Sequence, residues 1–149
     1  MTGGYSDSIV FDFGTNKSIV RSSGGIFILK LNFLGEYQWH KTLEGSGYGQ
    51  KINVDGEGNL YLLSYFLSGL EFEVKGKSVS LRAEGRGFLL LKFDNIGNIQ
   101  WYKHMDGKKY QSTMALATDK YGNTVCAGRF WPTSKIINGN ESDSLTSIG

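Results

Sequence analysis

Apolar and polar positions along the chain follow a two-residue period in short segments that end at glycine-containing turns. Residues 50–55 (QKINVD) and 114–119 (MALATD) alternate apolar and polar side chains, which is typical of half-buried strands. Residues 27–32 (FILKLN) and 89–94 (LLLKFD) are short apolar runs bounded by turn residues, and such runs also predict strands. Because no segment shows a helical stripe with capping residues, the pattern predicts an all-β protein.

The same segments recur along the chain at a nearly constant spacing. The pattern around Lys30 and Trp39 returns around Lys92 and Trp101, and both pairs of residues are 62 positions apart. A fixed period of this size indicates a repeat array. We expect one partial domain over residues 1–149, with a first repeat at about 3–63, a second at about 64–127 and the start of a third at 128–149.

Each repeat is predicted to hold four strands in an antiparallel meander. We denote them a (50–55), b (59–66), c (27–32 and 88–94) and d (37–43 and 99–105). Tight turns rich in Asp, Asn and Gly separate a from b and c from d, and these residues supply the backbone conformations that hairpins need. Four antiparallel strands in a unit of about 62 residues suit a blade of a β-propeller, and two blades make an incomplete ring.

The order of the repeated motifs resembles that of a known family. The motifs T-G-x-Y-S, F-D-F-G, S-S-G-G, F-x-x-K-L and G-x-x-x-W-x-K precede V-D-x-x-G-N-x-Y, and the pattern covers nearly the whole chain. It is similar to the bacterial β-propeller repeats of large extracellular proteins, which are of the seven-bladed type. The resemblance implies a propeller scaffold at the cell surface or outside the cell. Family members carry an acidic residue just before strand c, where this chain has Gly25–Ile26 and Gly87–Phe88.

Composition narrows the possible partners. The net charge is +2 without a long run of one sign, which argues against nucleic acid. No apolar run approaches the roughly 18 residues of a membrane span, and the start of the chain lacks the features of a signal peptide. The one cysteine, Cys126, permits no internal disulfide, which fits the cytosol or a disulfide-free secreted protein.

The recurring side chains are better explained by packing than by chemistry. Trp39 and Trp101 recur at one position of strand d, as expected of side chains that pack between blades. Lys30 and Lys92 also recur, which favours blade pairing over a nucleophile, because a catalytic lysine is needed only once.

The remaining candidates for chemistry form no catalytic pattern. His40 and His104 are not equivalent, since they are 64 positions apart, and no further metal ligands lie at a suitable spacing. Asp55, Asp94 and Asp119 open glycine-containing turns that their side chains are expected to cap, and Cys126 is expected to be a small buried side chain. We therefore expect no catalytic residue, no metal and no cofactor.

Binding residues are expected where the repeats differ most. In a meander, the d–a and b–c connections share one end of the strands, and here they are long and dissimilar in sequence. Variable loops on a rigid scaffold are where binding usually occurs. The candidate ligand-binding residues at this end are Trp131, Arg129, Tyr110, Lys108, Lys109, Tyr48 and Arg86.

The function expected from these observations is a non-catalytic β-propeller scaffold that binds protein or glycan within a larger surface or secreted bacterial protein. The alternative is a propeller enzyme of quinoprotein-like or glycan-cleaving type, with its active site in blades outside this chain. Both ends of the chain fall inside the repeat. The expected partners are therefore further blades of the same polypeptide, or identical copies that complete a ring.

Overall fold

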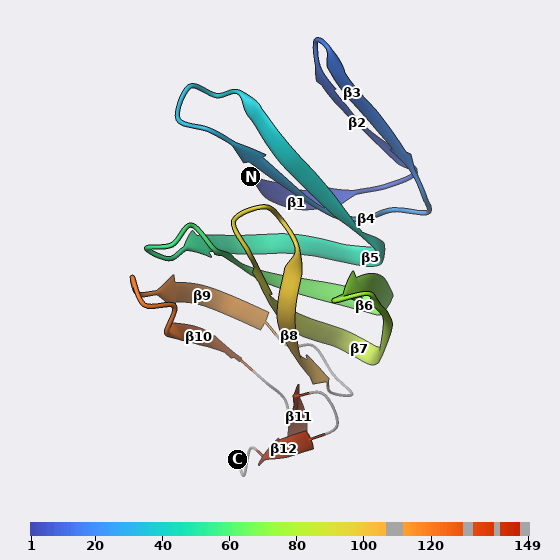
Figure 1. Cartoon of the computed structure of the whole chain (residues 1–149). Coiled ribbons are helices and arrows are strands. Elements are labelled where there is room, and N and C mark those ends of the chain that lie inside the picture. The colour runs from blue at the N-terminus through green and yellow to red at the C-terminus, as the bar shows by residue number, and fades with distance from the viewer. Residues whose placement is uncertain (107–111, 130–132, 139–140, 147–149) are drawn as a thin grey trace.

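The computed structural model describes residues 1–106, 112–129, 133–138 and 141–146. Within these ranges every regular element is a strand and every pairing is antiparallel, which confirms the all-β prediction. An open eight-stranded sheet has the order β1-β4-β5-β6-β7-β8-β11-β12, and β2–β3 and β9–β10 form two-stranded sheets beside it (Figure 1). The strands are β1 (Thr2–Tyr5), β2 (Ser8–Phe13), β3 (Asn16–Arg21), β4 (Gly25–Leu31), β5 (Tyr37–Val54), β6 (Leu60–Val74), β7 (Lys77–Phe93), β8 (Ile99–Asp106), β9 (Ser112–Thr118), β10 (Thr124–Arg129), β11 (Thr133–Asn138) and β12 (Glu141–Thr146).

Strand pairing repeats residue by residue at the spacing seen in the sequence. Lys30 lies opposite Trp39 between β4 and β5, and Lys92 lies opposite Trp101 between β7 and β8, with a register shift after each lysine. The β1–β4 pair corresponds in the same way to β6–β7, and β5–β6 corresponds to β9–β10. The sequence period is thus a period of backbone hydrogen bonding.

The predicted loops between strands b and c are wrong, because these segments are β-hairpins. The second copy, residues 69–82, continues β6 and β7 outward to a tight turn. Strands β2 and β3 (residues 8–13 and 16–21) pair in the register of the second copy, and so do β11 and β12 (residues 133–138 and 141–146). Dissimilar sequence in these segments does not mean dissimilar structure, since alternation of side chains is enough for a strand.

The predicted loop between strands d and a is also wrong in the copy that the structure describes. Residues 44–49 (EGSGYG) lie inside β5, whose first half pairs with β4 and whose second half pairs with β6. The register shifts next to Gly45 and Gly49, as expected where a strand bends. Gly45 has a φ of 130° and lies against the carbonyl of Gly69, so glycine serves close backbone approach rather than a loop.

The second and third hairpins tie their units to the preceding one. Glu71 of β6 lies opposite Glu44 of β5, and Lys135 of β11 lies opposite Asp106 of β8. The sheet is therefore continuous from unit to unit, and Figure 1 shows the units following one another from β1 to β12.

The core lies between the first and second units. Its members are apolar side chains from β4 to β8, including Ile26, Ile28, Leu43, Leu62, Phe66, Leu89, Leu91 and Phe93. Burial of each such side chain contributes about 1.5–3 kcal/mol relative to exposure. Trp39 packs against this core, and its indole N–H donates to the carbonyl of Asn95 in the second unit at 3.2 Å. Lys30 donates to the same carbonyl at 2.8 Å, which places both recurring residues of the first unit at the contact between units.

Candidate functional site

Three of the predicted binding residues lie in strands rather than in loops. Tyr48 is in β5, Arg86 is in β7 and Arg129 ends β10. The structure brings the first two together through a residue that the sequence analysis missed, Tyr65 of β6. The other predicted residues, Trp131, Tyr110, Lys108 and Lys109, lie outside the described residues.

Tyr48, Tyr65 and Arg86 form a row across three neighbouring strands, which we call the aromatic–arginine row. Tyr48 lies opposite Tyr65, and their rings stack with centroids 6.1 Å apart and planes 18° apart. The guanidinium carbon of Arg86 lies 4.3 Å from the centroid of the Tyr65 ring. Since Tyr48 is 48% exposed, the row offers an aromatic face at the surface beside a half-buried cation.

The row belongs to one unit only. In the third unit Ser112 lies opposite Arg129, where the second unit has Tyr48 opposite Tyr65. The register counterpart of Tyr48 is therefore Ser112. A side chain that is not repeated in every unit is not required by the fold of the unit, so it is available for ligand binding.

An apolar cavity of about 410 Å³ adjoins the row. It lies between β6, β7 and β8 on one side and β10 and β11 on the other. Its lining includes Phe88, which lies opposite Tyr65 of the row. Lys103 and Arg129 are cations in its lining, and none of the described lining residues is acidic. The apolar lining residues are Leu63, Phe88, Leu90, Met105, Ala127 and Ile136.

Cys126 also lines this cavity, and the expectation that it is buried is wrong. The residue is exposed in β10, because the described part of the chain places no strand on the outer edge of β10. Partial desolvation raises the pKa of the Cys126 thiol. The thiol is therefore protonated near neutral pH, which does not favour a nucleophile.

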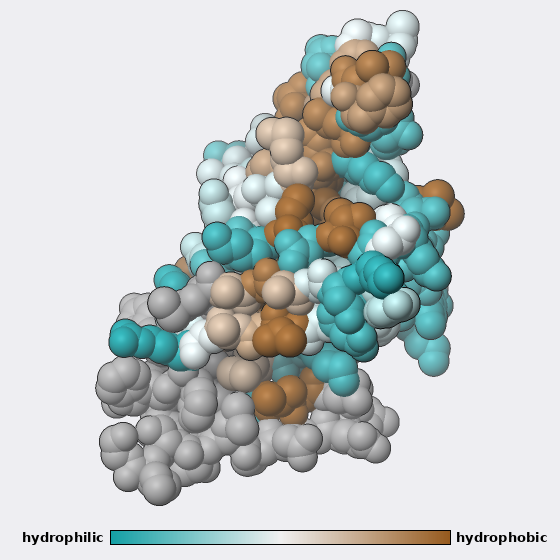
Figure 2. Space-filling model, turned by 90° about the vertical axis from the view of Figure 1, so that its left-hand side faces the viewer, coloured by the Kyte–Doolittle hydropathy of each residue, from teal (hydrophilic) through white to brown (hydrophobic). Residues whose placement is uncertain are grey.

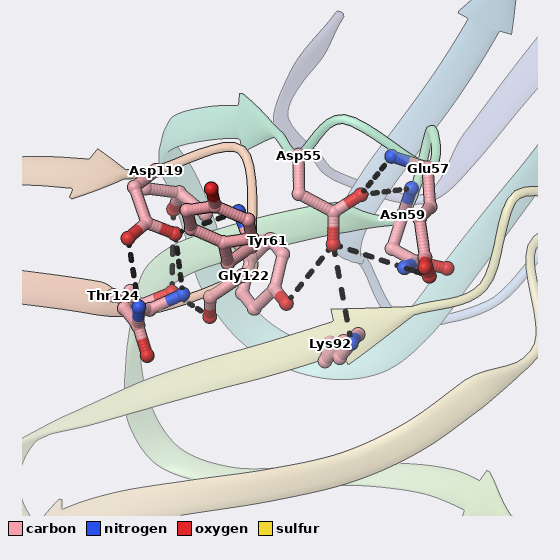
Figure 3. Close-up of polar contacts among 11 residues, drawn as sticks. Asp55, Glu57, Asn59, Tyr61, Lys92, Asp119, Gly122 and Thr124 are labelled. Carbon is pink, nitrogen blue, oxygen red and sulfur yellow. Dashed lines mark hydrogen bonds and ion pairs between the residues drawn. The ribbon is translucent and has the colours of Figure 1, made fainter.

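Figure 3 shows a polar cluster around Asp55 at the turn between β5 and β6. One carboxylate oxygen accepts the backbone N–H groups of Glu57 and Asn59, both at 3.0 Å. The other accepts the Asn59 amide at 2.9 Å and the Tyr61 hydroxyl at 3.2 Å, and the Lys92 ammonium lies 4.0 Å away.

Both charges of this cluster are held in their ionised forms. Burial acts to raise the pKa of Asp55, but the hydrogen bonds from Asn59, Glu57 and Tyr61 outweigh it and lower that pKa. The hydrogen bond with Tyr61 and nearby negative charges raise the pKa of Lys92 against its desolvation. A fixed carboxylate and a fixed ammonium join the turn to β7, which is a structural role.

The other tight turns use the same arrangement, so the predicted capping role of the aspartates is confirmed. The carboxylate of Asp94 accepts the backbone N–H groups of residues 96 and 98, and that of Asp119 accepts those of residues 121 and 123. In the turn between β4 and β5, the side-chain oxygen of Asn32 takes the place of the aspartate and accepts the backbone N–H groups of Leu34 and Glu36. The Asn32 amide in turn donates to the Glu36 carboxylate. No group of three or more His, Cys, Asp or Glu residues in the described ranges could hold a metal ion.

The side of the molecule that carries these turns has its own apolar surface. Viewed from that side, apolar side chains form a broken band down the molecule (Figure 2). Among the turn residues, Phe33 is 94% exposed, and Leu34 and Ile96 are also exposed.

The two histidines occupy different positions of the repeat, as the sequence predicted. His40 lies opposite Leu29, and its register counterpart is Tyr102. The Nδ1 atom of His40 lies 2.9 Å from the hydroxyl of Tyr37, and the imidazole stacks on Phe11 with centroids 4.2 Å apart. Burial and the charge of Lys41 lower the pKa of His40, so a neutral packed imidazole is favoured at neutral pH.

Comparison with known proteins identifies no relative. No protein-family model, no curated protein and no solved structure matches the chain. In the residues that the structure describes, no helix has the length and apolar character to cross a membrane. The function must therefore be argued from the geometry of the chain itself.

Proposed function

We propose that this chain is a non-catalytic binding scaffold of β-propeller type, in which the repeated four-stranded units are blades. The residue-by-residue repetition of strand register supports a scaffold built from equivalent units. The location at the bacterial surface or outside the cell, within a larger protein, is part of the same proposal and rests on the motif pattern.

The observation that carries the binding role is the aromatic–arginine row beside the cationic apolar cavity. Arg86, Lys103 and Arg129 supply positive charge around apolar lining residues, and no acid lies among the described residues of that lining. Such a surface complements a protein segment that carries carboxylates beside apolar side chains. Aromatic and arginine side chains are also the residue types most often found to dominate protein interfaces.

A glycan is the second candidate ligand, and the stacked tyrosines favour it. Tyr48 and Tyr65 present nearly parallel rings, and Tyr48 is half exposed. Aromatic rings combine a large apolar face with little conformational entropy, which suits contact with the apolar face of a sugar ring.

Titration of isotopically labelled protein with two probes, followed by NMR, tests this proposal. The probes are an acetylated Asp-Leu-Glu-Phe amide and chitotetraose. We expect one of them to shift the amide signals of residues 48, 65 and 86. We also expect Arg86→Ala to weaken its binding about fivefold, because the variant lacks the guanidinium that packs on the Tyr65 ring and supplies positive charge beside the cavity.

The matched controls are Arg21→Ala and Tyr121→Ala, because both residues are exposed and lie outside the row. Thermal unfolding of each variant separates loss of binding from loss of fold. The proposal is overturned if neither probe shifts the row signals, or if the controls weaken binding as much as the row variant does.

A further inference from the structure

Strand β1 of the first unit packs closely against the second half of β5, beside the aromatic–arginine row. A methyl group added at Gly4 would lie 2.9 Å from Cδ2 of the Tyr48 ring and 2.8 Å from the carbonyl oxygen of Gly47. A methyl group added at Gly49 would collide with the Thr2 side chain. The Tyr48 ring therefore occupies space that a side chain at position 4 would need.

The backbone conformation does not explain the glycine at position 4. Gly4 does not have a positive φ, and it pairs regularly with Ile26 of β4. Branched and aromatic side chains are favoured at such paired positions, and glycine inside a strand often marks a site where another group approaches closely. The groups that approach Gly4 are the Tyr48 ring and the Gly47 carbonyl.

The repeat shows the same matching of side-chain sizes between the next two units, in the reverse order. The counterpart of Gly4 in the second unit is Tyr65, as the registers of β1–β4 and β6–β7 show. The counterpart of Tyr48 in the third unit is Ser112. At these two positions, the first and second units thus combine Gly4 with Tyr48, and the second and third units combine Tyr65 with Ser112.

This reversal is what makes the two tyrosines neighbours. Tyr48 belongs to the first combination and Tyr65 to the second, and the two residues lie opposite each other on β5 and β6. Their rings stack with planes 18° apart while Tyr48 also lies against Gly4. A larger residue at position 4 would push the Tyr48 ring out of this arrangement, because close-packed side chains have little room to shift.

We propose that Gly4 is a positioning residue of the aromatic–arginine row. It holds the half-exposed Tyr48 ring parallel to Tyr65, in the orientation that meets the apolar face of a sugar ring. The consequence for binding rests on the proposed function, and within it on the glycan candidate. Gly4 itself acts only through Tyr48 and needs no contact with the ligand.

The test compares Gly4→Ala with the matched control Gly3→Ala. Both variants add one methyl group to β1, but the one at Gly3 meets the Phe27 ring at 2.8 Å and has no contact with Tyr48. In NMR spectra of the free protein, we expect the nuclear Overhauser contacts between the Tyr48 and Tyr65 rings to be lost in Gly4→Ala and kept in Gly3→Ala. Chitotetraose should bind Gly4→Ala about tenfold more weakly than Gly3→Ala, because the ring platform is displaced.

A second measurement separates the Tyr48 ring from the Gly47 carbonyl, which the added methyl group also meets. Urea unfolding of Gly4→Ala is measured alone and in a Tyr48→Ser background, which has the small residue found at the counterpart position 112. If the ring is the obstacle, Gly4→Ala should lower the unfolding midpoint less in the Tyr48→Ser background. A Gly4→Ala chain that folds only together with Tyr48→Ser would give the same answer.

Three results would each overturn the proposal. They are ring contacts between Tyr48 and Tyr65 that persist in Gly4→Ala, equal effects of the two glycine variants, and equal destabilisation by Gly4→Ala in both backgrounds. If the unsubstituted protein does not bind chitotetraose, the glycan candidate of the proposed function fails. The ring contacts and the unfolding measurements still decide the role of Gly4 in that case, so the two failures are distinguishable.

Discussion

Strands β6 and β10 occupy the same position of the repeat, yet one lies in the core and the other at the surface. Leu62 is fully buried, and its register counterpart Cys126 is exposed. The pairing with the preceding strand is nevertheless the same, including the register shift. Backbone pairing therefore follows the local pattern of the strand, whereas burial depends on which distant strands pack against it.

The largest expected effect comes from truncating the same position in both strands. Leu62→Ala should lower the free energy of unfolding by about 3 kcal/mol, because it leaves a cavity in the core between the units. Cys126→Ala should change it by less than about 0.5 kcal/mol. Urea unfolding of the two variants checks this, and equal losses would show that β10 is as enclosed as β6.

A smaller change in the free energy of unfolding is expected at two equivalent turns. One of them contacts the neighbouring unit and the other does not. Gly35 and Gly97 occupy the same turn position, with φ values of 81° and 91°. Gly35→Ala should cost about 1 kcal/mol for the left-handed backbone alone, since nothing lies near its added methyl group. Gly97→Ala should cost about 1 kcal/mol more, because its methyl group meets the Trp39 ring at about 3.0 Å.

The same urea measurements, repeated in a Trp39→Ala background, sharpen this test. If the indole causes the extra cost, the difference between the two glycine variants should disappear there. A difference that persists would place its origin in the turn itself, and not in the contact between units.

The loss of fold stability at acidic pH should depend more on Asp55 than on Asp119, although both occupy equivalent turns. Hydrogen bonds lower both pKa values below the ordinary 3.8, so both carboxylates stabilise the fold fully above about pH 5. This stabilisation is lost as the pH falls through 3.8 towards the lowered values. Because Asp55 also binds Tyr61 and lies near Lys92, Asp55→Asn should flatten the acid side of the stability profile more than Asp119→Asn does.

Unfolding midpoints measured from pH 6 to pH 3 provide the readout for these variants. Two identical profiles would mean that the contacts with Tyr61 and Lys92 add nothing to the turn. A greater flattening in Asp119→Asn would reverse the assignment.

The smallest effect is expected at the surface of the second hairpin. Arg82 and Glu71 form an ion pair at 3.2 Å, and both side chains are exposed. Glu71→Gln should change the free energy of unfolding by less than about 0.5 kcal/mol, since solvent screens such pairs and Glu44 lies opposite Glu71. Urea unfolding at low and high salt measures it, and a loss above 1 kcal/mol would indicate that the hairpin is more enclosed than the structure shows.

The candidate site was only partly predictable from the sequence. Tyr48 and Arg86 lie in segments whose sequences differ between repeats, but these segments are strands and not the predicted loops. Tyr65 was missed because it lies in a predicted strand, and nothing in a strand sequence says which residues face it across the sheet. Its role depends on the registers of β5 with β6 and of β6 with β7.

The strands, the tight turns and the repeat period follow from local sequence patterns alone. Alternation of side chains and the Asp, Asn and Gly of turns such as 94–98 act within a few residues, so a linear pattern contains them. Tertiary contacts determine that the connecting segments form hairpins and that Tyr65 bridges Tyr48 and Arg86. They also determine that, in the part of the chain that the structure describes, β10 pairs only with β9. Those features arise from contacts between residues far apart in the chain, where burial and pairing depend on which strands meet.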